Sequence, residues 1–341
     1  MRQSTLFRKG GIVLHNNVSI AIATVIAVPA AVNAEPANIA FYASLRIQAE
    51  SVRPDDRSVL GSYSGFRDAY SRIGFNADYA LTSSVDVFAQ LELPLDLANG
   101  AVQDPWDQEE DIRIAKVGLR GNLGSLSYGQ MWMPYYNAIA YPVDMFSTYY
   151  SGFATYTVFR RDRTLSYYSP SFAAFSLAAG WSEDNGANGD NRLQLTGSYS
   201  PGDTTLSLGM DDLGGPHDAR IYGVSLMHTM DSLYIGAKYE VHDSRISSGY
   251  GADGDRAINL YAGYTLGKNT FKVMLANVEG YGEDIVHLGM DHQYNDQLKL
   301  FAEYYDEEDT AAITEERGGL AETAWNASGG QAFAIGMRYD F

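Results

Sequence analysis

The sequence predicts an all-β fold, a transmembrane antiparallel up-and-down β-barrel of sixteen strands, on three observations. Apolar and polar residues alternate one by one along sixteen segments, which is the pattern of strands with one apolar and one polar face. The connections between these segments alternate between short turns and long polar loops, as they do in membrane-spanning barrels. The chain also ends on an alternating segment, residues 332–341, which closes with Phe341.

The N-terminal segment, residues 1–34, has the three parts of an export signal. Arg2, Arg8 and Lys9 form a basic start, residues 18–28 form an apolar run, and Val32-Asn33-Ala34 is a small-residue cleavage site. The alternative is a membrane anchor, but the run of eleven residues is short of the about 20 that a spanning helix needs. We therefore expect residues 1–34 to be removed and residues 35–341 to form a single barrel domain.

The expected strands follow one another through the rest of the chain. They are residues 39–47, 73–81, 85–93, 112–121, 126–133, 164–168, 175–181, 192–199, 205–210, 220–228, 233–242, 257–266, 270–277, 285–293, 298–305 and 332–341. Tight turns such as 200–203 and 267–269 contrast with long connections such as 94–111, 243–256 and 306–331. Strands of a soluble all-β protein alternate too, but the export signal, the number of strands and the terminal phenylalanine favour a membrane barrel.

Composition excludes several classes of protein. The chain has no cysteine, which excludes disulfide bonds, thiolate metal sites and a catalytic thiol. Its formal net charge is −18, and the expected signal contains only basic charges, so the exported part is more acidic still. Nucleic acid is not an expected partner, because binding a polyanion needs a basic face.

Four groups of short motifs also recur in order along the chain. They are Ser71–Phe75 with Val87–Glu92; Val117–Leu119 with Leu123–Leu126 and Tyr128–Gln130; Leu165–Phe172 with Phe175–Gly180; and Ile335–Phe341. Together they resemble the general bacterial porins, the trimeric sixteen-stranded barrels of the Gram-negative outer membrane. The resemblance implies a water-filled channel for passive diffusion of ions and small hydrophilic solutes, with no cofactor, metal or enzymatic activity.

The same resemblance implies partners for this chain. These are two further copies in a homotrimer, the lipopolysaccharide and lipid of the outer membrane, and the outer-membrane assembly machinery, which would recognise the last strand by Phe341. The second long loop, residues 94–111, would clasp the neighbouring subunit. The acidic run that it contains, residues 104–111, is expected to be a solvated charged loop, with loose binding of divalent cations as the alternative.

The resemblance further implies that a third extracellular loop, about residues 137–159, folds into the barrel and narrows it. Asp144 is the only acid of that loop, and Tyr141 lies beside it. Arg72 falls on an arginine of the family's barrel wall, whereas Gln130 occupies a position where the family often has arginine. Asp144, Tyr141 and Arg72 belong to the expected pore constriction, whereas Gln130 is expected on the lumen-facing wall.

Further basic residues are candidates from the pattern alone. Arg160, Arg161 and Arg163 follow the expected loop closely, and they either face the lumen at the constriction or lie at the barrel rim against water and lipopolysaccharide phosphate. Arg46, Lys116 and Arg120 fall on polar strand faces, so we expect them on the lumen wall.

Two other functions stay open at this point. The aromatic loop residues Tyr141, Phe146, Tyr149, Tyr150 and Tyr156, with Trp132, could form a stacking track of an oligosaccharide-selective porin, or they could pack the loop against the wall. An outer-membrane hydrolase or adhesin is the rival class. The sequence has neither a G-x-S-x-G elbow nor an H-E-x-x-H motif, so we expect no enzyme.

Overall fold

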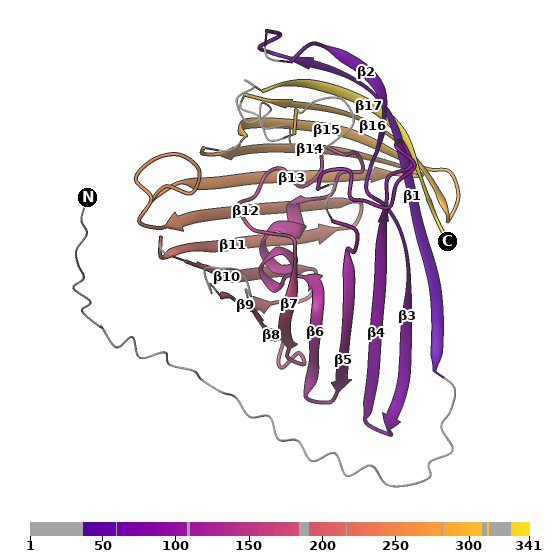
Figure 1. Ribbon diagram of the computed structural model, residues 1–341, viewed down its shortest axis with the longest axis vertical. Helices are drawn as coiled ribbons and strands as arrows, with labels where there is room; N and C mark the ends of the chain where they lie inside the picture. The colour runs from indigo at the N-terminus through magenta and orange to yellow at the C-terminus, as the bar shows by residue number, and fades with distance from the viewer. Residues whose placement is uncertain are drawn as a thin grey trace, which may run out of the picture. The chain divides into compact units, whose positions relative to one another are not determined.

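A closed antiparallel sheet forms nearly the whole of the protein in the computed structural model (Figure 1). The structure describes residues 37–58, 60–107, 110–183, 191–215, 217–280, 282–308, 312–313 and 329–341. The expected export signal, residues 1–34, lies outside the described residues, as does part of the long connection 306–331.

The strands follow one another in chain order around the sheet. They are β1 (Asn38–Pro54), β2 (Tyr63–Asp68), β3 (Ser71–Thr82), β4 (Val85–Leu95), β5 (Ile114–Gly121), β6 (Gly124–Trp132), β7 (Arg160–Tyr168), β8 (Phe175–Ser182), β9 (Arg192–Tyr199), β10 (Thr204–Gly214), β11 (Ala219–Met230), β12 (Leu233–Asp243), β13 (Arg256–Leu266), β14 (Asn269–Val278), β15 (Glu283–Gln293), β16 (Leu298–Glu307) and β17 (Gly330–Asp340). The last strand, β17, pairs with β1 from Ser44↔Asp340 to Pro54↔Gly330, which closes the barrel and leaves no open edge.

The barrel has sixteen strands, as predicted, because β2 and β3 share one position beside β1. β3 pairs with the first half of β1, up to Ser44↔Arg72, and β2 pairs with the second half, from Ile47↔Asp68 onward. The register advances three residues on β1 and four between β2 and β3, so one extra residue forms a bulge, with Tyr70 at a φ of 67°. The sequence predicts no strand at β2, because the outer face of this segment has only one large apolar residue, Phe66.

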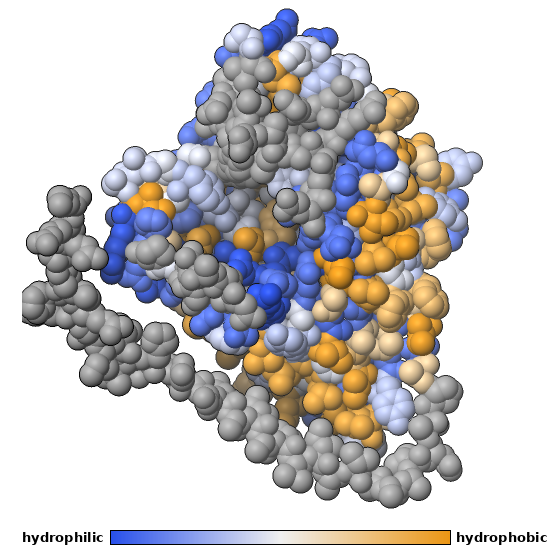
Figure 2. Space-filling view, in the orientation of Figure 1, coloured by the Kyte–Doolittle hydropathy of each residue, from blue (hydrophilic) through white to orange (hydrophobic). Residues whose placement is uncertain are grey.

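The two faces of the sheet differ as the alternation predicts. On β13, Ile258 and Leu260 point outward and are exposed, whereas Asn259 and Tyr261 point inward and are buried. Figure 2 shows apolar residues gathered on the outer face of the strands in the lower part of the view. An apolar outer face with fully paired backbone groups is what a lipid environment requires.

The segment between β6 and β7 packs against the inner face of the barrel. It contains a π-helical turn, η1 (Tyr136–Ala140), and a 3₁₀ turn, η2 (Tyr141–Val143), drawn in magenta within the curve of the strands in Figure 1. We call residues 133–159 the inner loop. Its side chains Ile139 and Tyr149 belong to one buried apolar cluster with wall residues such as Ile221. No helix among the described residues is long and apolar enough to cross a membrane.

Candidate functional site

Three wall glycines make room for the first half of the inner loop. Gly209 and Gly223 are opposite each other on β10 and β11, and Gly236 lies on the next strand, β12. A Cβ atom at Gly223 would lie 2.1 Å from the hydroxyl oxygen of Tyr135, and one at Gly236 would lie 2.5 Å from the carbonyl oxygen of Pro142. Only glycine therefore lets the loop approach the wall this closely at these positions.

Hydrogen bonds hold this half of the loop on the three wall glycines, Gly209, Gly223 and Gly236, which we call the glycine patch. The backbone N–H of Tyr135 donates to Gln194 Oε1 at 2.9 Å. Ser225 Oγ donates to the carbonyl of Ala138 at 2.6 Å, and the Tyr234 hydroxyl donates to the carbonyl of Pro142 at 2.8 Å. A buried loop cannot leave its backbone N–H and C=O groups unpaired. Here wall side chains pair with three of them.

Four wall carboxylates anchor the second half of the loop. Each is buried, forms an ion pair with a wall cation, and accepts hydrogen bonds from loop residues. The pairs are Glu50 with Arg67 (2.7 Å), Asp211 with Arg192 (2.6 Å), Glu240 with Lys238 (2.5 Å) and Glu303 with Lys272 (2.8 Å). The loop donors are Tyr150 to Glu50, Thr157 to Asp211, Thr155 and Tyr156 to Glu240, and Ser147 and Thr148 to Glu303.

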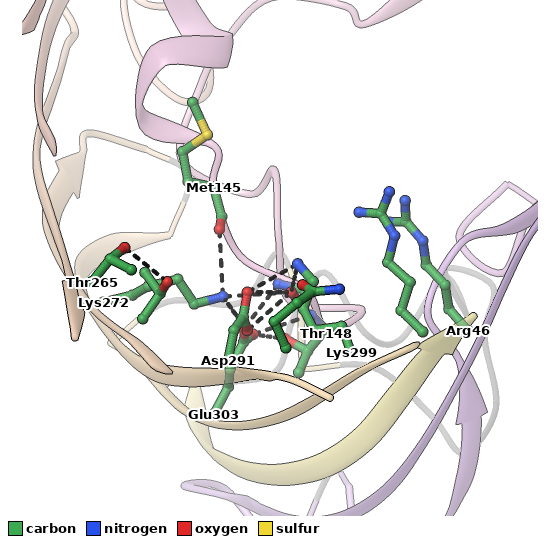
Figure 3. A network of polar contacts seen from close by, with 12 residues as sticks. Arg46, Met145, Thr148, Thr265, Lys272, Asp291, Lys299 and Glu303 are labelled. Atoms are coloured by element: carbon green, nitrogen blue, oxygen red, sulfur yellow. Dashed lines mark hydrogen bonds and ion pairs between the residues drawn. The ribbon is translucent and has the colours of Figure 1, made fainter. Parts of the chain in front are cut away.

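The Glu303 anchor, shown in Figure 3, accepts three hydrogen bonds from the loop, as the Glu240 anchor does. It accepts the Ser147 N–H at 2.8 Å, and the Thr148 N–H and hydroxyl at 3.1 and 2.5 Å. His287 Nε2 lies 3.1 Å from the same carboxylate, and the His287 ring stacks on Phe146 of the loop with centroids 3.5 Å apart. Removing one member of such a buried charged group leaves the others uncompensated, which is expensive.

A cavity of about 560 Å³ lies between the inner loop and the wall that faces it. Its lining contains six basic residues, namely Arg46, Arg72, Arg113, Arg160, Lys299 and Arg338. Two acids also line it, Asp104 and Asp144. In Figure 3, Arg46 and the loop residue Met145 lie on opposite sides of the space that both line. We call this space the lumen cavity.

Three of these cations form a row across neighbouring strands. Arg46 on β1 is opposite Arg338 on β17, and Arg338 is opposite Lys299 on β16. Arg338 Nε pairs with Asp340 at 2.7 Å, and Lys299 pairs with Asp291 at 3.0 Å. Arg46 donates Nε to Ser44 Oγ at 2.9 Å and forms no ion pair within the described part of the chain.

The other three cations share carboxylates. Arg113 contacts Glu92 at 3.1 Å and Asp104 at 2.6 Å. Arg160 contacts the same Asp104 at 3.2 Å and also pairs with Glu110. The weakest pair is that of Arg72, whose Nε lies 3.7 Å from Glu92. The charge of Arg72 is therefore less neutralised by carboxylates than that of Arg113 or Arg160, and it contributes more to the field in the cavity.

Asp104 corrects the expectation for the acidic run 104–111, because it is buried rather than solvated. Two arginines, Arg113 and Arg160, compensate its charge. Its neighbour Trp106 packs on Phe153 of the inner loop with centroids 4.7 Å apart. This part of the second long loop thus turns into the barrel, while residues 108–109 lie outside the described part.

Asp144 lines the cavity from the loop side. Its carboxylate accepts hydrogen bonds from the Tyr136 hydroxyl at 2.6 Å and from Ser151 Oγ. Burial first, and then the Asp144 carboxylate, raise the pKa of the Tyr136 hydroxyl well above its ordinary value. The phenol therefore remains a donor to Asp144 at any physiological pH and fixes the position of this charge.

The loop aromatics divide into two groups. Phe146, Tyr149, Tyr150 and Tyr156 are buried against the wall, as in the alternative of a packed loop. Tyr141 is 51% exposed and lines the cavity together with Trp132, Tyr136 and Phe159. In this second group the ring centroids of Trp132 and Tyr136 are 4.8 Å apart, and those of Tyr136 and Phe159 are 4.6 Å apart.

The remaining candidates lie outside the cavity lining. Arg161 is opposite Met131 on β6, next to Arg160, and Arg163 is exposed with Asp162 at 3.8 Å. Gln130 donates to Glu110 Oε1 at 3.0 Å. Two further residues complete the set: Lys116 lies on β5 opposite Gly129, and Arg120, near the turn at the end of β5, pairs with Asp78 at 2.6 Å.

Residues 19–338 match the family model described as Gram-negative porin. The chain is a Gram-negative porin. This porin is accordingly a multi-pass β-barrel of the outer membrane that forms a channel for passive diffusion. Sequence comparison with curated proteins finds no match.

Solved structures show the same fold as this porin. The anion-selective porin from Comamonas acidovorans is 17% identical, with a TM-score of 0.70 over 90% of this chain and all of that one. The Salmonella typhi OmpF complex with daunomycin is 17% identical, with a TM-score of 0.67 over 89% and 97%. The trimer form of OmpT, an outer membrane protein of Vibrio cholerae, is 16% identical, with a TM-score of 0.62 over 90% and 100%.

Sequence reasoning missed four charged residues of the porin's cavity as site residues. Asp104 belongs to a long connection, where alternation assigns no face, and Arg113 falls in the expected strand 112–121 but on the same face as the apolar Val117 and Leu119. Lys299 and Arg338 lie on strands far from the inner loop in sequence. For Arg338 the signal was present, since alternation places it on the polar face of the last strand.

Proposed function

We propose that this porin is a general diffusion channel whose narrowest and most selective region is the lumen cavity. The observation that carries the proposal is that one cavity is lined by the loop acid Asp144 and by the row Arg46, Arg338 and Lys299. Charged rings in a water-filled pore are a standard device for selecting ions and small polar solutes. Such a field favours small hydrophilic solutes over apolar ones without any specific binding step.

Ion selectivity in this proposal has two sources with different ranges. The chain is acidic overall, with a net charge of −18, whereas the cavity lining is mainly basic. At low ionic strength the Debye length reaches about 30 Å, so acids far from the cavity also act on passing ions, but at 0.1 M it is about 10 Å. We propose that preference for cations grows as salt is diluted.

An oligosaccharide-selective channel is the second candidate. It is less well supported, because Tyr149, Tyr150 and Tyr156 are buried against the wall and cannot form a continuous track. Single-channel recording in planar bilayers separates the two functions. A diffusion porin gives ohmic steps that maltooligosaccharides do not block, whereas block at micromolar sugar would support the second candidate.

The proposal includes a homotrimer that contacts lipopolysaccharide and outer-membrane lipid, and that reaches the membrane through the assembly machinery by its last strand and Phe341. It also includes removal of residues 1–34, so that residues 35–341 form the mature barrel. Closed symmetry is the usual result for identical subunits. A trimer band on unboiled gels that disappears on boiling is expected, and a monomeric native protein would contradict it.

Catalysis has no place in the proposed function. The buried histidine His287 is engaged with Glu303, and His292 Nδ1 lies 2.8 Å from Asn269 Oδ1. Within the described residues, no group of three or more histidine, aspartate or glutamate side chains is arranged to hold a metal ion. We propose neither a cofactor nor a metal for this channel.

A further inference from the structure

We infer that the lumen cavity is a weak binding subsite for small aromatic carboxylates, and this inference rests on the proposed channel function. Two groups of side chains in the same cavity carry it. One group binds a carboxylate and the other contacts a flat ring. A cavity of about 560 Å³ has the size of ordinary small-molecule sites.

The carboxylate half is the basic row. Arg46 is opposite Arg338 on the lumen face, and its guanidinium forms no ion pair within the described part of the chain. Asp340, whose charge acts on Arg46, pairs with Arg338 instead. The nearby Arg72 has only a long contact of 3.7 Å to a carboxylate that Arg113 also uses. A guanidinium with free donors binds a carboxylate through two parallel hydrogen bonds, which is a strong and directional contact.

The aromatic half consists of Tyr141 with Trp132, Tyr136 and Phe159. Tyr141 is 51% exposed and inclined to Tyr136, with centroids 6.3 Å apart and planes at 60°. This large exposed ring gives the charged lumen an apolar surface. Passive diffusion of ions and small hydrophilic solutes does not depend on such a surface. Tilted and offset ring pairs at such distances are worth about two- to tenfold in affinity.

The charges of the cavity discriminate against other occupants. A simple cation meets six basic residues and an Asp144 carboxylate that already accepts two hydroxyl donors. An inorganic anion uses the basic row but leaves the rings without a partner. A neutral sugar contacts the rings but leaves Arg46 without an ion-pair partner. An aromatic carboxylate carries both chemical groups that the lining of this one cavity matches, a carboxylate and a flat ring.

The test compares two probes of equal charge and similar size, benzoate and cyclohexanecarboxylate, on trimers in planar bilayers with KCl. The wild-type channel should be blocked by benzoate at concentrations about two- to tenfold lower than by cyclohexanecarboxylate. Tyr141→Ala and Tyr141→Leu should bring this ratio to about one, and Tyr141→Phe should retain it. Arg46→Gln should weaken both probes equally, because it removes only the shared carboxylate contact.

Two matched variants control for non-specific effects. Tyr250→Ala removes a tyrosine of equal exposure, 50%, from the loop after β12, and Arg120→Gln removes an arginine outside the cavity lining. Both should keep the wild-type ratio. Equal block by the two probes in the wild type, or an unchanged ratio in Tyr141→Ala, would overturn the subsite while normal KCl conductance upholds the channel. Absence of KCl conductance would instead overturn the proposed function.

Discussion

Arg46 and Arg338 lie directly opposite each other on the paired strands β1 and β17, and both line the lumen cavity. Like charges opposite each other in a sheet destabilise it by roughly 0.2–1 kcal/mol. Lys299 extends the row by one strand on the other side of Arg338. A barrel that needed only to fold would gain nothing from this arrangement, so we attribute it to the field that passing solutes experience.

Arg46→Gln is therefore expected to leave the barrel as stable as before or slightly more stable. It should also shift the reversal potential in a salt gradient towards cations, since it removes a lumen charge that forms no ion pair in the described structure. The dissociation temperature of the trimer on unboiled gels measures the first effect and bilayer recording the second. A large fall in dissociation temperature would show that Arg46 is needed for folding instead.

Glu303→Gln should release the inner loop. The change removes one of the two counter-charges of Lys272, which also pairs with Asp291 at 2.9 Å, and it weakens the contacts to Ser147 and Thr148. A loss of up to about 3–5 kcal/mol in stability is expected. The open channel should become noisy and should close at lower voltage. Asp284→Asn is the matched control, because among the described residues this carboxylate accepts a side-chain hydrogen bond from Asn277 alone and is not an anchor. Quiet currents in Glu303→Gln would contradict the anchoring role.

Gly223→Ala tests the glycine patch under the loop. Its Cβ would lie 2.1 Å from the Tyr135 hydroxyl oxygen and 2.8 Å from Ile139 Cγ2, and overpacking of this kind costs about 1–3 kcal/mol. We expect altered single-channel conductance, partly restored by adding Tyr135→Phe. Gly197→Ala on β9 is the control, since its Cβ would meet only Leu177 Cδ2 at 3.4 Å. Equal effects of the two alanines would exclude a special role for the patch.

Acidification should shift the channel towards anions through Glu110. Burial first, and the nearby Asp104 carboxylate in addition, raise the pKa of this carboxyl above its ordinary value, although the adjacent Arg160 guanidinium acts in the opposite direction. A raised pKa means that the proton binds at a higher pH than for a free glutamate, about 4.3. Protonation removes one negative charge beside Arg160, so the lumen becomes more positive as pH falls. The reversal potential measured between pH 7 and pH 4 should show this shift, and Glu110→Gln should abolish it.

The fold could be predicted from sequence because each strand carries its own alternation. The register of Ile258 and Leu260 outward against Asn259 and Tyr261 inward follows directly from that pattern. The bulge at Tyr70 could not be predicted, because β2 lacks an apolar outer face and its pairing depends on the unusually long β1.

The site was predictable only in part. Asp144, Tyr141 and Arg72 were proposed from the resemblance, Arg46 from its strand face, and Arg160 from its place just after the expected loop; all five line the cavity. Arg161 and Arg163 were not distinguishable from Arg160 in sequence, because the inner loop ends there and alternation gives no direction. The buried state of Asp104 was not predictable either, since it depends on Arg113 and Arg160 reaching it from separate segments.

We propose that Asp144 and the basic wall together set the selectivity of the channel. Reversal potentials across a KCl gradient, recorded for the wild type, Asp144→Asn and Arg72→Ser, are the decisive measurement. Asp144→Asn should shift the potential towards anions and Arg72→Ser should shift it towards cations, with both shifts persisting at 1 M salt, where the Debye length is about 3 Å. If neither substitution moves the potential, the lumen cavity is not the selective region of the channel.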